Sequence, residues 1–178
     1  MDILLLGSGG REHAIAVALK ASPLCDALYV APGNGGTAAI ATNIKLDIND
    51  PAAVADYAAE HGVGLVVIGP EAPLVAGVAD AVRAKGIPAF GPGAQGAQME
   101  GSKRFAKEFM ERHGIPTAAY RSFTEQAGAE AYVAQRFAAD VKVLVVKADG
   151  LAAGKGVVVA TSEQEALEAV RDCFSGHF

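Results

Sequence analysis

The stretch Val143–Thr161, VLVVKADGLAAGKGVVVAT, consists of two valine-rich runs joined by a loop rich in glycine and lysine. Such runs predict strand, loop and strand. Glycine lets backbone N–H groups approach an anion closely and lysine supplies charge, so the loop is typical of a flap over phosphates. It is not a P-loop, because three residues separate Gly150 from Gly154 and a strand follows. An ordinary hairpin with a flexible tip is the alternative.

The composition of the whole chain predicts an α/β protein with close helix–sheet packing. The 178 residues are 51% hydrophobic, contain 21 glycines and carry a formal net charge of −5. This charge argues against a general nucleic-acid surface. Cys25 and Cys173 have no metal-ligand spacing, so we expect free thiols in a reducing compartment. The apolar run Ile3–Leu6 is too short for a signal peptide or a membrane span, which predicts a soluble cytoplasmic protein.

The first residues predict a strand, a glycine-rich turn and a helix. Ile3–Leu6 runs into Gly7-Ser8-Gly9-Gly10-Arg11-Glu12-His13, and an alanine-rich helical segment follows. A turn of this kind suits a phosphate, because free N–H groups and a helix dipole meet there. The dinucleotide fingerprint is incomplete, since Glu12 replaces the third glycine and no acidic residue ends the second strand, Ala27–Val30. A nicotinamide cofactor is therefore disfavoured, while a monophosphate and a turn without any ligand both stay open.

Strands then alternate with helices, which predicts an open parallel sheet with ligands at the carboxyl ends of its strands. Expected helices begin at Asp50-Pro51 and span Val75–Lys85. The further strands are expected at 43–46, 65–68 and 88–90. Loops 7–12, 32–37 and 69–74 should meet at one crevice. Glu71, in a stiff loop between two prolines, is either a solvated acid or a functional one.

A second region follows Gly91-Pro92-Gly93, which is expected near the edge of the first domain. Ser102 should cap a helix that carries Lys103 in its first turn, where the lysine and the helix could share an anion. A strand is expected at Tyr120–Phe123 and a helix at Glu125–Phe137, and Ser162 to Glu165 forms a capping box for a last helix. This small sheet leaves its last helix uncovered, so the chain is interpreted as a fragment.

Five sequence strings together resemble the phosphoribosylamine–glycine ligase family of ATP-grasp enzymes. They occur in the family's order and span most of the chain, although each glycine-rich loop alone is weak evidence for the family. The strings are GSGGREHA from Gly7, APGN from Ala31, GPEAPL from Gly69, EGSK from Glu100 and KADGLAAGKGV from Lys147. The family is considerably longer, so the chain resembles its N-terminal portion.

The resemblance implies a parallel-sheet, Rossmann-like pre-ATP-grasp domain at 1–101 that binds the substrate. The first part of an α+β ATP-grasp domain would follow at 102–178. It implies that ATP phosphorylates the glycine carboxylate and that the amine of 5-phosphoribosylamine then attacks to give glycinamide ribonucleotide, ADP and phosphate. The implied ATP-binding residues are Lys103, Lys147, Asp149, Gly150, Gly154, Lys155 and Gly156. The implied substrate-binding residues are Gly9, Gly10, Arg11, Gly33, Asn34 and Glu71.

The same resemblance implies what this chain lacks. The family's ligands for Mg²⁺ or Mn²⁺ would lie beyond residue 178, no side chain here is an obvious general base, and the chain alone is expected to be inactive. Its partners would be small molecules, with neither nucleic acid nor membrane. Two alternatives stay open: another ATP-grasp carboxylate–amine ligase, and a non-catalytic module that binds phosphate or a nucleotide.

Overall fold

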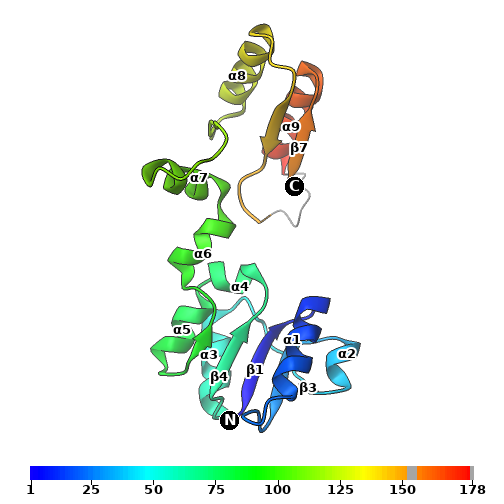
Figure 1. Cartoon of the computed structure of the whole chain (residues 1–178), viewed down its shortest axis with the longest axis vertical. Coiled ribbons are helices and arrows are strands. Elements are labelled where there is room, and N and C mark those ends of the chain that lie inside the picture. The colour runs from blue at the N-terminus through cyan, green and yellow to red at the C-terminus, as the bar shows by residue number, and fades with distance from the viewer. Residues whose placement is uncertain (152–155, 177–178) are drawn as a thin grey trace. The chain divides into compact units, whose positions relative to one another are not determined.

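In the computed structural model, which describes residues 1–151 and 156–176, the chain divides into two compact units, Met1–Gly101 and Ser102–Phe178. Figure 1 shows the elements of each unit. We call them unit 1 and unit 2 and describe each by itself.

Unit 1 is built on a five-stranded parallel sheet in the order β3-β2-β1-β4-β5. Its central strands consist almost entirely of apolar residues, because helices cover both faces of a parallel sheet. The edge strands β3 and β5 have two residues each. The strands are β1 (Ile3–Gly7), β2 (Leu28–Pro32), β3 (Thr42–Asn43), β4 (Leu65–Ile68) and β5 (Ala89–Phe90).

The alternation of side chains along β1 separates two layers of core. Leu4 and Leu6 pack with α3 and α5 on one face, while Ile3 and Leu5 pack against α1 on the other. Figure 1 shows these helices on opposite sides of the sheet. The helices of unit 1 are α1 (Gly10–Lys20), α2 (Gly35–Ala38), α3 (Pro51–Glu60), α4 (Glu71–Val75), α5 (Val78–Ala84) and α6 (Ala94–Gly101).

Unit 2 contains the antiparallel pair β6 (Leu144–Lys147) and β7 (Val157–Ala160). One face of this pair packs on two helices around Ala129, Val133, Ala160 and Val170. The predicted strand, loop and strand are therefore confirmed, although residues 152–155 lie outside the described part of the chain. The helices of unit 2 are α7 (Lys103–Arg112), α8 (Gln126–Ala138) and α9 (Glu163–Ser175).

Three sequence-based expectations for single elements are wrong. Residues Tyr120–Phe123 form no strand, and the third strand stops at Asn43. The helix expected at 75–85 begins only at Val78, because Gly77 adopts a left-handed φ of 93° and separates it from α4. The sequence also did not predict α6, which follows Gly91–Gly93.

Three predicted helix starts are confirmed. Asp50 accepts hydrogen bonds from the N–H groups of Ala52 and Ala53 ahead of Pro51. Ser102 caps α7 and Ser162 caps α9, each by accepting a hydrogen bond from the N–H group three residues on. Among the described residues no helix is long and apolar enough to cross a membrane.

Candidate functional site

The three loops that follow β1, β2 and β4 are joined by hydrogen bonds, as predicted from the parallel sheet. Gly33 N–H donates to the Gly7 carbonyl over 3.2 Å, and the Asn34 side-chain amide donates to Ser8 O over 2.9 Å. Arg11 Nη1 donates to Glu71 Oε1 over 3.0 Å. Segments up to 60 residues apart in sequence thus form one polar edge of unit 1.

Glu12 lies under this edge and is 4% exposed. Its Oε2 accepts a 2.8 Å hydrogen bond from Gly9 N–H, and its Oε1 accepts a 2.9 Å bond from Arg11 Nε. A Cβ atom on Gly7 or Gly69 would overlap the Glu12 side chain. These glycines therefore make room for a buried carboxylate, which sequence reasoning had treated only as a departure from the dinucleotide fingerprint.

Arg11 and Glu71 form an ion pair at the surface, with side chains 55% and 44% exposed. The prolines around Glu71 predicted a stiff loop, but Glu71 is the first residue of α4. The hydrogen bond from Arg11 lowers the pKa of the Glu71 carboxyl. Hydrogen bonds to Glu12 and then to Glu71 raise the pKa of Arg11. The pair is thus a charged donor and a charged acceptor side by side.

The loop after β2 is fixed by its own polar side chains. Asn34 Oδ1 accepts from the N–H groups of Gly36 and Thr37, so it caps α2. The buried Thr37 hydroxyl lies 2.8 Å from Asn43 Oδ1, and Asn43 Nδ2 donates to Asn34 O. Gly33 has a φ of 72°, which favours glycine. Sequence reasoning missed Thr37 and Asn43, whose only signal was their proximity to the loop.

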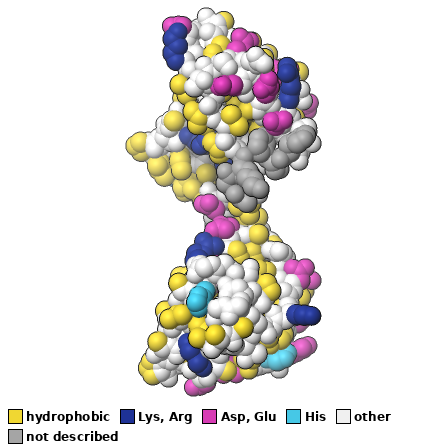
Figure 2. Space-filling model, turned by 90° about the vertical axis from the view of Figure 1, so that its right-hand side faces the viewer, with side chains coloured by type: hydrophobic (Ala, Val, Ile, Leu, Met, Phe, Trp, Pro, Cys, Tyr) yellow, Lys and Arg dark blue, Asp and Glu magenta, His cyan; other side chains and the backbone are white. Residues whose placement is uncertain are grey.

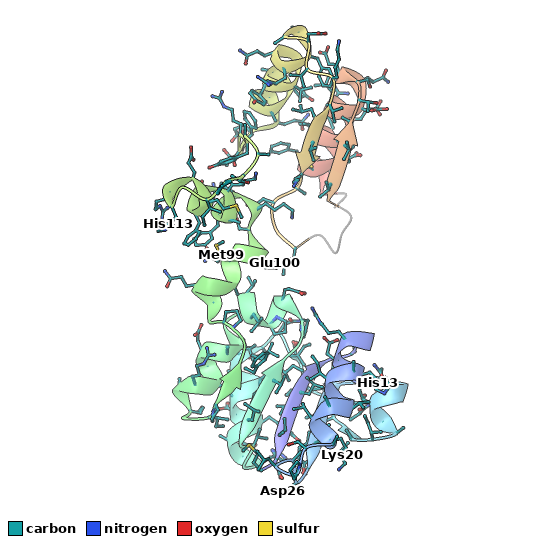
Figure 3. All side chains as sticks on the ribbon, in the orientation of Figure 1. His13, Lys20, Asp26, Met99, Glu100 and His113 are labelled. Carbon is teal, nitrogen blue, oxygen red and sulfur yellow. The ribbon has the colours of Figure 1, made fainter. Side chains whose placement is uncertain are left out.

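His13 of α1 packs against the same loop, and Figure 3 labels it beside α2. A Cβ atom on Gly36 would lie 2.9 Å from the imidazole, so this glycine allows close packing of the two helices. Gly10, the first residue of α1, has open space around its Cβ position. Several of the loop glycines therefore make room for side chains of the protein itself. Composition alone cannot distinguish such glycines from glycines that make room for a ligand.

A small cavity of about 160 Å³ lies between α4 and α6. Glu71 forms part of its wall, while most of the lining is apolar. Met99 and Glu100, labelled in Figure 3, line it from α6. The cavity therefore gives the Glu71 side chain an apolar neighbour on one side and Arg11 on the other.

In unit 2, the residues after β6 are attached to the first turn of α7. The Asp149 carboxylate accepts hydrogen bonds from the Ser102 hydroxyl (3.0 and 3.2 Å) and from Arg104 N–H (3.2 Å). Lys103 Nζ donates a 2.7 Å bond to Gly150 O. Burial acts to raise the pKa of Asp149, but hydrogen bonds from Arg104 N–H and Ser102 outweigh it, so the pKa is lowered.

The outer face of the β6–β7 pair is open. On this face Val145 pairs with Val159, and Lys147 pairs with Val157. Val145 is 47% exposed and Val159 is 61% exposed. Lys147 is exposed at the end of β6, and Ala148 N–H donates to Gly156 O over 2.8 Å. Hydrophobic side chains are also visible on the surface of unit 2 in Figure 2. The predicted ATP residues Gly154 and Lys155 lie outside the described residues.

No group of three or more His, Cys, Asp or Glu side chains that could hold a metal ion occurs within 1–151 and 156–176. Both cysteines are free, as predicted. The candidate site of each unit thus consists of charged side chains and backbone groups: Arg11, Glu12 and Glu71 in unit 1, and Lys103, Lys147 and Asp149 in unit 2.

A parallel-sheet unit followed by a unit with a glycine- and lysine-rich strand connection is the arrangement of an ATP-grasp protein. Residues 101–178 match the family model "Phosphoribosylglycinamide synthetase, ATP-grasp (A) domain", and residues 1–100 match "Phosphoribosylglycinamide synthetase, N domain". The chain therefore belongs to the phosphoribosylglycinamide synthetase family.

Relatives and solved structures agree with this family. The chain is 56% identical over all its 178 residues to a phosphoribosylamine–glycine ligase of Agrobacterium fabrum, of which it spans 41%. A crystal structure of the Thermotoga maritima phosphoribosylamine–glycine ligase matches 94% of this chain and 38% of its own, with a TM-score of 0.70 and 31% identity. The biotin carboxylase domain of Hydrogenobacter thermophilus 2-oxoglutarate carboxylase, solved with MgADP, matches 98% of this chain and 40% of its own. Its TM-score is 0.72 at 18% identity, a likeness of fold alone.

Proposed function

We propose that a polypeptide of the relatives' length containing these residues joins glycine to 5-phosphoribosylamine at the expense of ATP. The observation that carries the proposal is the 56% identity to a phosphoribosylamine–glycine ligase along the whole chain. Because the chain spans 41% of that relative, the reaction is assigned to the longer polypeptide. ATP supplies the phosphoryl group that converts the glycine carboxylate into an acyl phosphate, which the amine of phosphoribosylamine can attack.

Unit 2 would contact the triphosphate of ATP through its lysines. Lys147 presents an ammonium group on the open face of β6, and Lys103 presents one at the start of α7. Ammonium groups favour phosphate oxygens through charge-assisted hydrogen bonds. Gly150 and Gly156 flank the predicted flap. Asp149, itself a carboxylate bonded to Ser102 and Arg104, fits an organising role in this loop better than contact with phosphate.

Unit 1 would bind the phosphoribosylamine at the polar edge made by its three loops. Arg11 offers guanidinium donors for a phosphate, and Glu71 offers acceptors for hydroxyl or amine groups. Gly9, Gly10, Gly33 and Asn34 shape the backbone around them. Positioning of this kind, together with charge neutralisation in unit 2, accounts for the catalysis without a dedicated general base.

The metal is proposed to be Mg²⁺ or Mn²⁺, held by ligands outside these 178 residues. Biotin carboxylase from Hydrogenobacter thermophilus, which shares the fold, was solved with MgADP. The remaining partners are small molecules, with no nucleic acid or membrane. A cytoplasmic setting is proposed because both cysteines are free.

The test is a coupled assay for ADP release with glycine, phosphoribosylamine and Mg-ATP. The polypeptide of the relatives' length should turn over only when all three are present, and the 178-residue chain should show no turnover, because the metal ligands are proposed to lie outside it. ADP release that does not depend on glycine would point to another ATP-grasp ligase. Nucleotide binding by the longer polypeptide without any turnover would favour a non-catalytic module.

A further inference from the structure

We propose that Glu12 is a positioning residue for the ribose-phosphate substrate: its buried carboxylate holds Arg11 in place, so that Arg11 and Glu71 together receive the ligand. This inference rests on the proposed function, because it takes phosphoribosylamine to bind at the edge formed by the loops of unit 1. Glu12 itself does not reach the ligand and acts through Arg11.

Glu12 is held firmly in place, and the orientation of the Arg11 side chain depends on its bond to Glu12. Glu12 is 4% exposed and fixed by Gly9 N–H, whereas the Arg11 side chain is 55% exposed. A bond at Nε sets the plane of the whole guanidinium group, because that group is rigid and flat. The 2.9 Å bond from Nε to Glu12 thus directs Nη1 to Glu71, 3.0 Å away.

The space around Glu12 shows that its carboxylate fills the glycine-rich turn. Cβ atoms on Gly7, Gly9 or Gly69 would each come within contact of the Glu12 side chain. In turns that bind an external anion, this space and the N–H groups are left for the ligand. Here the Gly9 N–H is already engaged by Glu12. Gly9 N–H is therefore not available to the substrate, which favours the exposed Arg11 side chain as the group of this turn that contacts it.

The exposed pair suits a ligand that has both acceptors and donors. A guanidinium group carries five N–H donors, and the bonds to Glu12 and Glu71 use two of them. Glu71 is 44% exposed and has acceptor sites to spare. A pentose phosphate offers phosphate oxygens for Arg11 and hydroxyl groups for Glu71. Loss of Glu12 would leave Arg11 free to form a bidentate pair with Glu71, which would close both groups to the ligand.

The experiment measures binding of ribose 5-phosphate to the 178-residue chain by isothermal titration calorimetry. Glu12→Gln, which keeps the shape and removes the charge, should weaken binding about tenfold, the effect of one hydrogen bond to a charged group. Arg11→Ala should weaken it at least as much, and Glu12→Gln added to Arg11→Ala should change nothing further. The matched control is Glu60→Gln, an exposed glutamate at the end of α3, which should bind like the unchanged chain.

The sign of the effect separates positioning from simple electrostatics. Removing a carboxylate near a phosphate would tighten binding if charge alone mattered. Tighter or unchanged binding in Glu12→Gln, or effects of the two substitutions that simply add, would overturn the proposal. Failure of the unchanged chain to bind ribose 5-phosphate would overturn it as well.

Arg11→Lys covers the case in which Glu12→Gln does not fold, because Arg11 is exposed and a lysine has no Nε to give to an intact Glu12. It should weaken binding in the same way, and binding equal to that of the unchanged chain would contradict the proposal. In the longer polypeptide, Glu12→Gln should raise KM for phosphoribosylamine while kcat and KM for ATP stay constant. If the longer polypeptide turns over and Glu12→Gln leaves its KM for phosphoribosylamine unaltered, only the inference about Glu12 is overturned. If the expected pattern of ribose 5-phosphate binding is found but the longer polypeptide does not turn over, only the proposed reaction is overturned.

Discussion

Lys103 donates a 2.7 Å hydrogen bond from Nζ to the carbonyl oxygen of Gly150, 47 residues further along the chain. The neighbouring Asp149 carboxylate accepts from Ser102 and Arg104 at the same helix start. The connection between β6 and β7 is therefore attached at its first residues to the N-terminus of α7. Lys103 of the proposed ATP site takes part in this attachment, and Lys147 lies two residues before Asp149 at the end of β6.

Replacing Asp149 by Asn should loosen the first turn of α7. The carboxylate lies where a helix dipole favours negative charge, so its loss should cost about 1 kcal/mol of local stability. Amide hydrogen exchange in residues 102–106 should then become about fivefold faster. Asp172→Asn, in the last turn of α9, is the matched control and should leave exchange in α7 unaltered. Equal exchange in Asp149→Asn and the unchanged chain would show that the attachment contributes no stability.

The contribution of Asp149 should disappear in acid. Its pKa is lowered in the folded chain, so the unfolded chain takes up the proton first as the pH falls. The stabilisation is therefore complete above the ordinary aspartate pKa of about 3.9 and is lost as the pH falls through the lower folded value. The difference in exchange between the unchanged chain and Asp149→Asn should be constant from pH 7 to about 5 and shrink below about 4. A difference that grows in acid would contradict this.

Gly69→Ala should destabilise unit 1 because the new methyl group overlaps Glu12. Overpacking of this kind costs about 1–3 kcal/mol, which should lower the midpoint of urea unfolding. The cost should fall in a Glu12→Ala background, where the space is free, and the double-mutant cycle measures that coupling. Gly35→Ala, with no neighbouring atom within 4 Å of its Cβ position, is the control and should shift the midpoint little. Equal costs of Gly69→Ala in both backgrounds would exclude the overlap with Glu12 as the cause.

Lys103→Met and Lys147→Met should each raise KM for ATP in the polypeptide of the relatives' length. Losing one charge-assisted hydrogen bond to phosphate predicts an increase of about tenfold or more. Lys142→Met removes an exposed lysine that pairs with Asp140 ahead of β6, and it should leave KM for ATP unaltered. Steady-state kinetics at saturating glycine make the comparison. A similar KM for ATP in all three variants would remove these lysines from the ATP site.

Sequence patterns identified the elements that local chemistry specifies. The apolar run of β1, the proline after Asp50 and the serine caps each fix an element with residues close in sequence. Parallel strands also predicted which loops would meet. The motif strings identified the family, and their resemblance assigned roles that geometry alone does not.

The elements that sequence missed depend on distant partners. The start of α6 is capped by Asp80, whose Oδ2 accepts from Ala94 N–H over 2.7 Å, and α6 itself has little apolar periodicity. Tyr120–Phe123 has β-forming residues, but the Tyr120 hydroxyl bonds to Glu111 and no strand among the described residues pairs with this segment. Strand propensity without a neighbouring strand does not produce a sheet.

The burial of Glu12 in the candidate site was not predicted for the same reason. A glutamate in a glycine-rich turn gives no local sign that it is buried, since its cover comes from Gly69 after another strand. Asp149 was assigned to ATP by resemblance, and its contacts with Ser102 and Arg104 follow from the way α7 and β6 meet.

The packing of Glu12 among Gly7, Gly9 and Gly69 also constrains how the family can diverge. A larger residue at position 7 or 69 has no room while Glu12 remains, and a smaller residue at position 12 leaves a void that the glycines do not fill. Substitutions at these positions should therefore be inherited together. An alignment of many relatives should show positions 7, 12 and 69 varying in concert, whereas Gly35, which has open space around it, should drift independently of them.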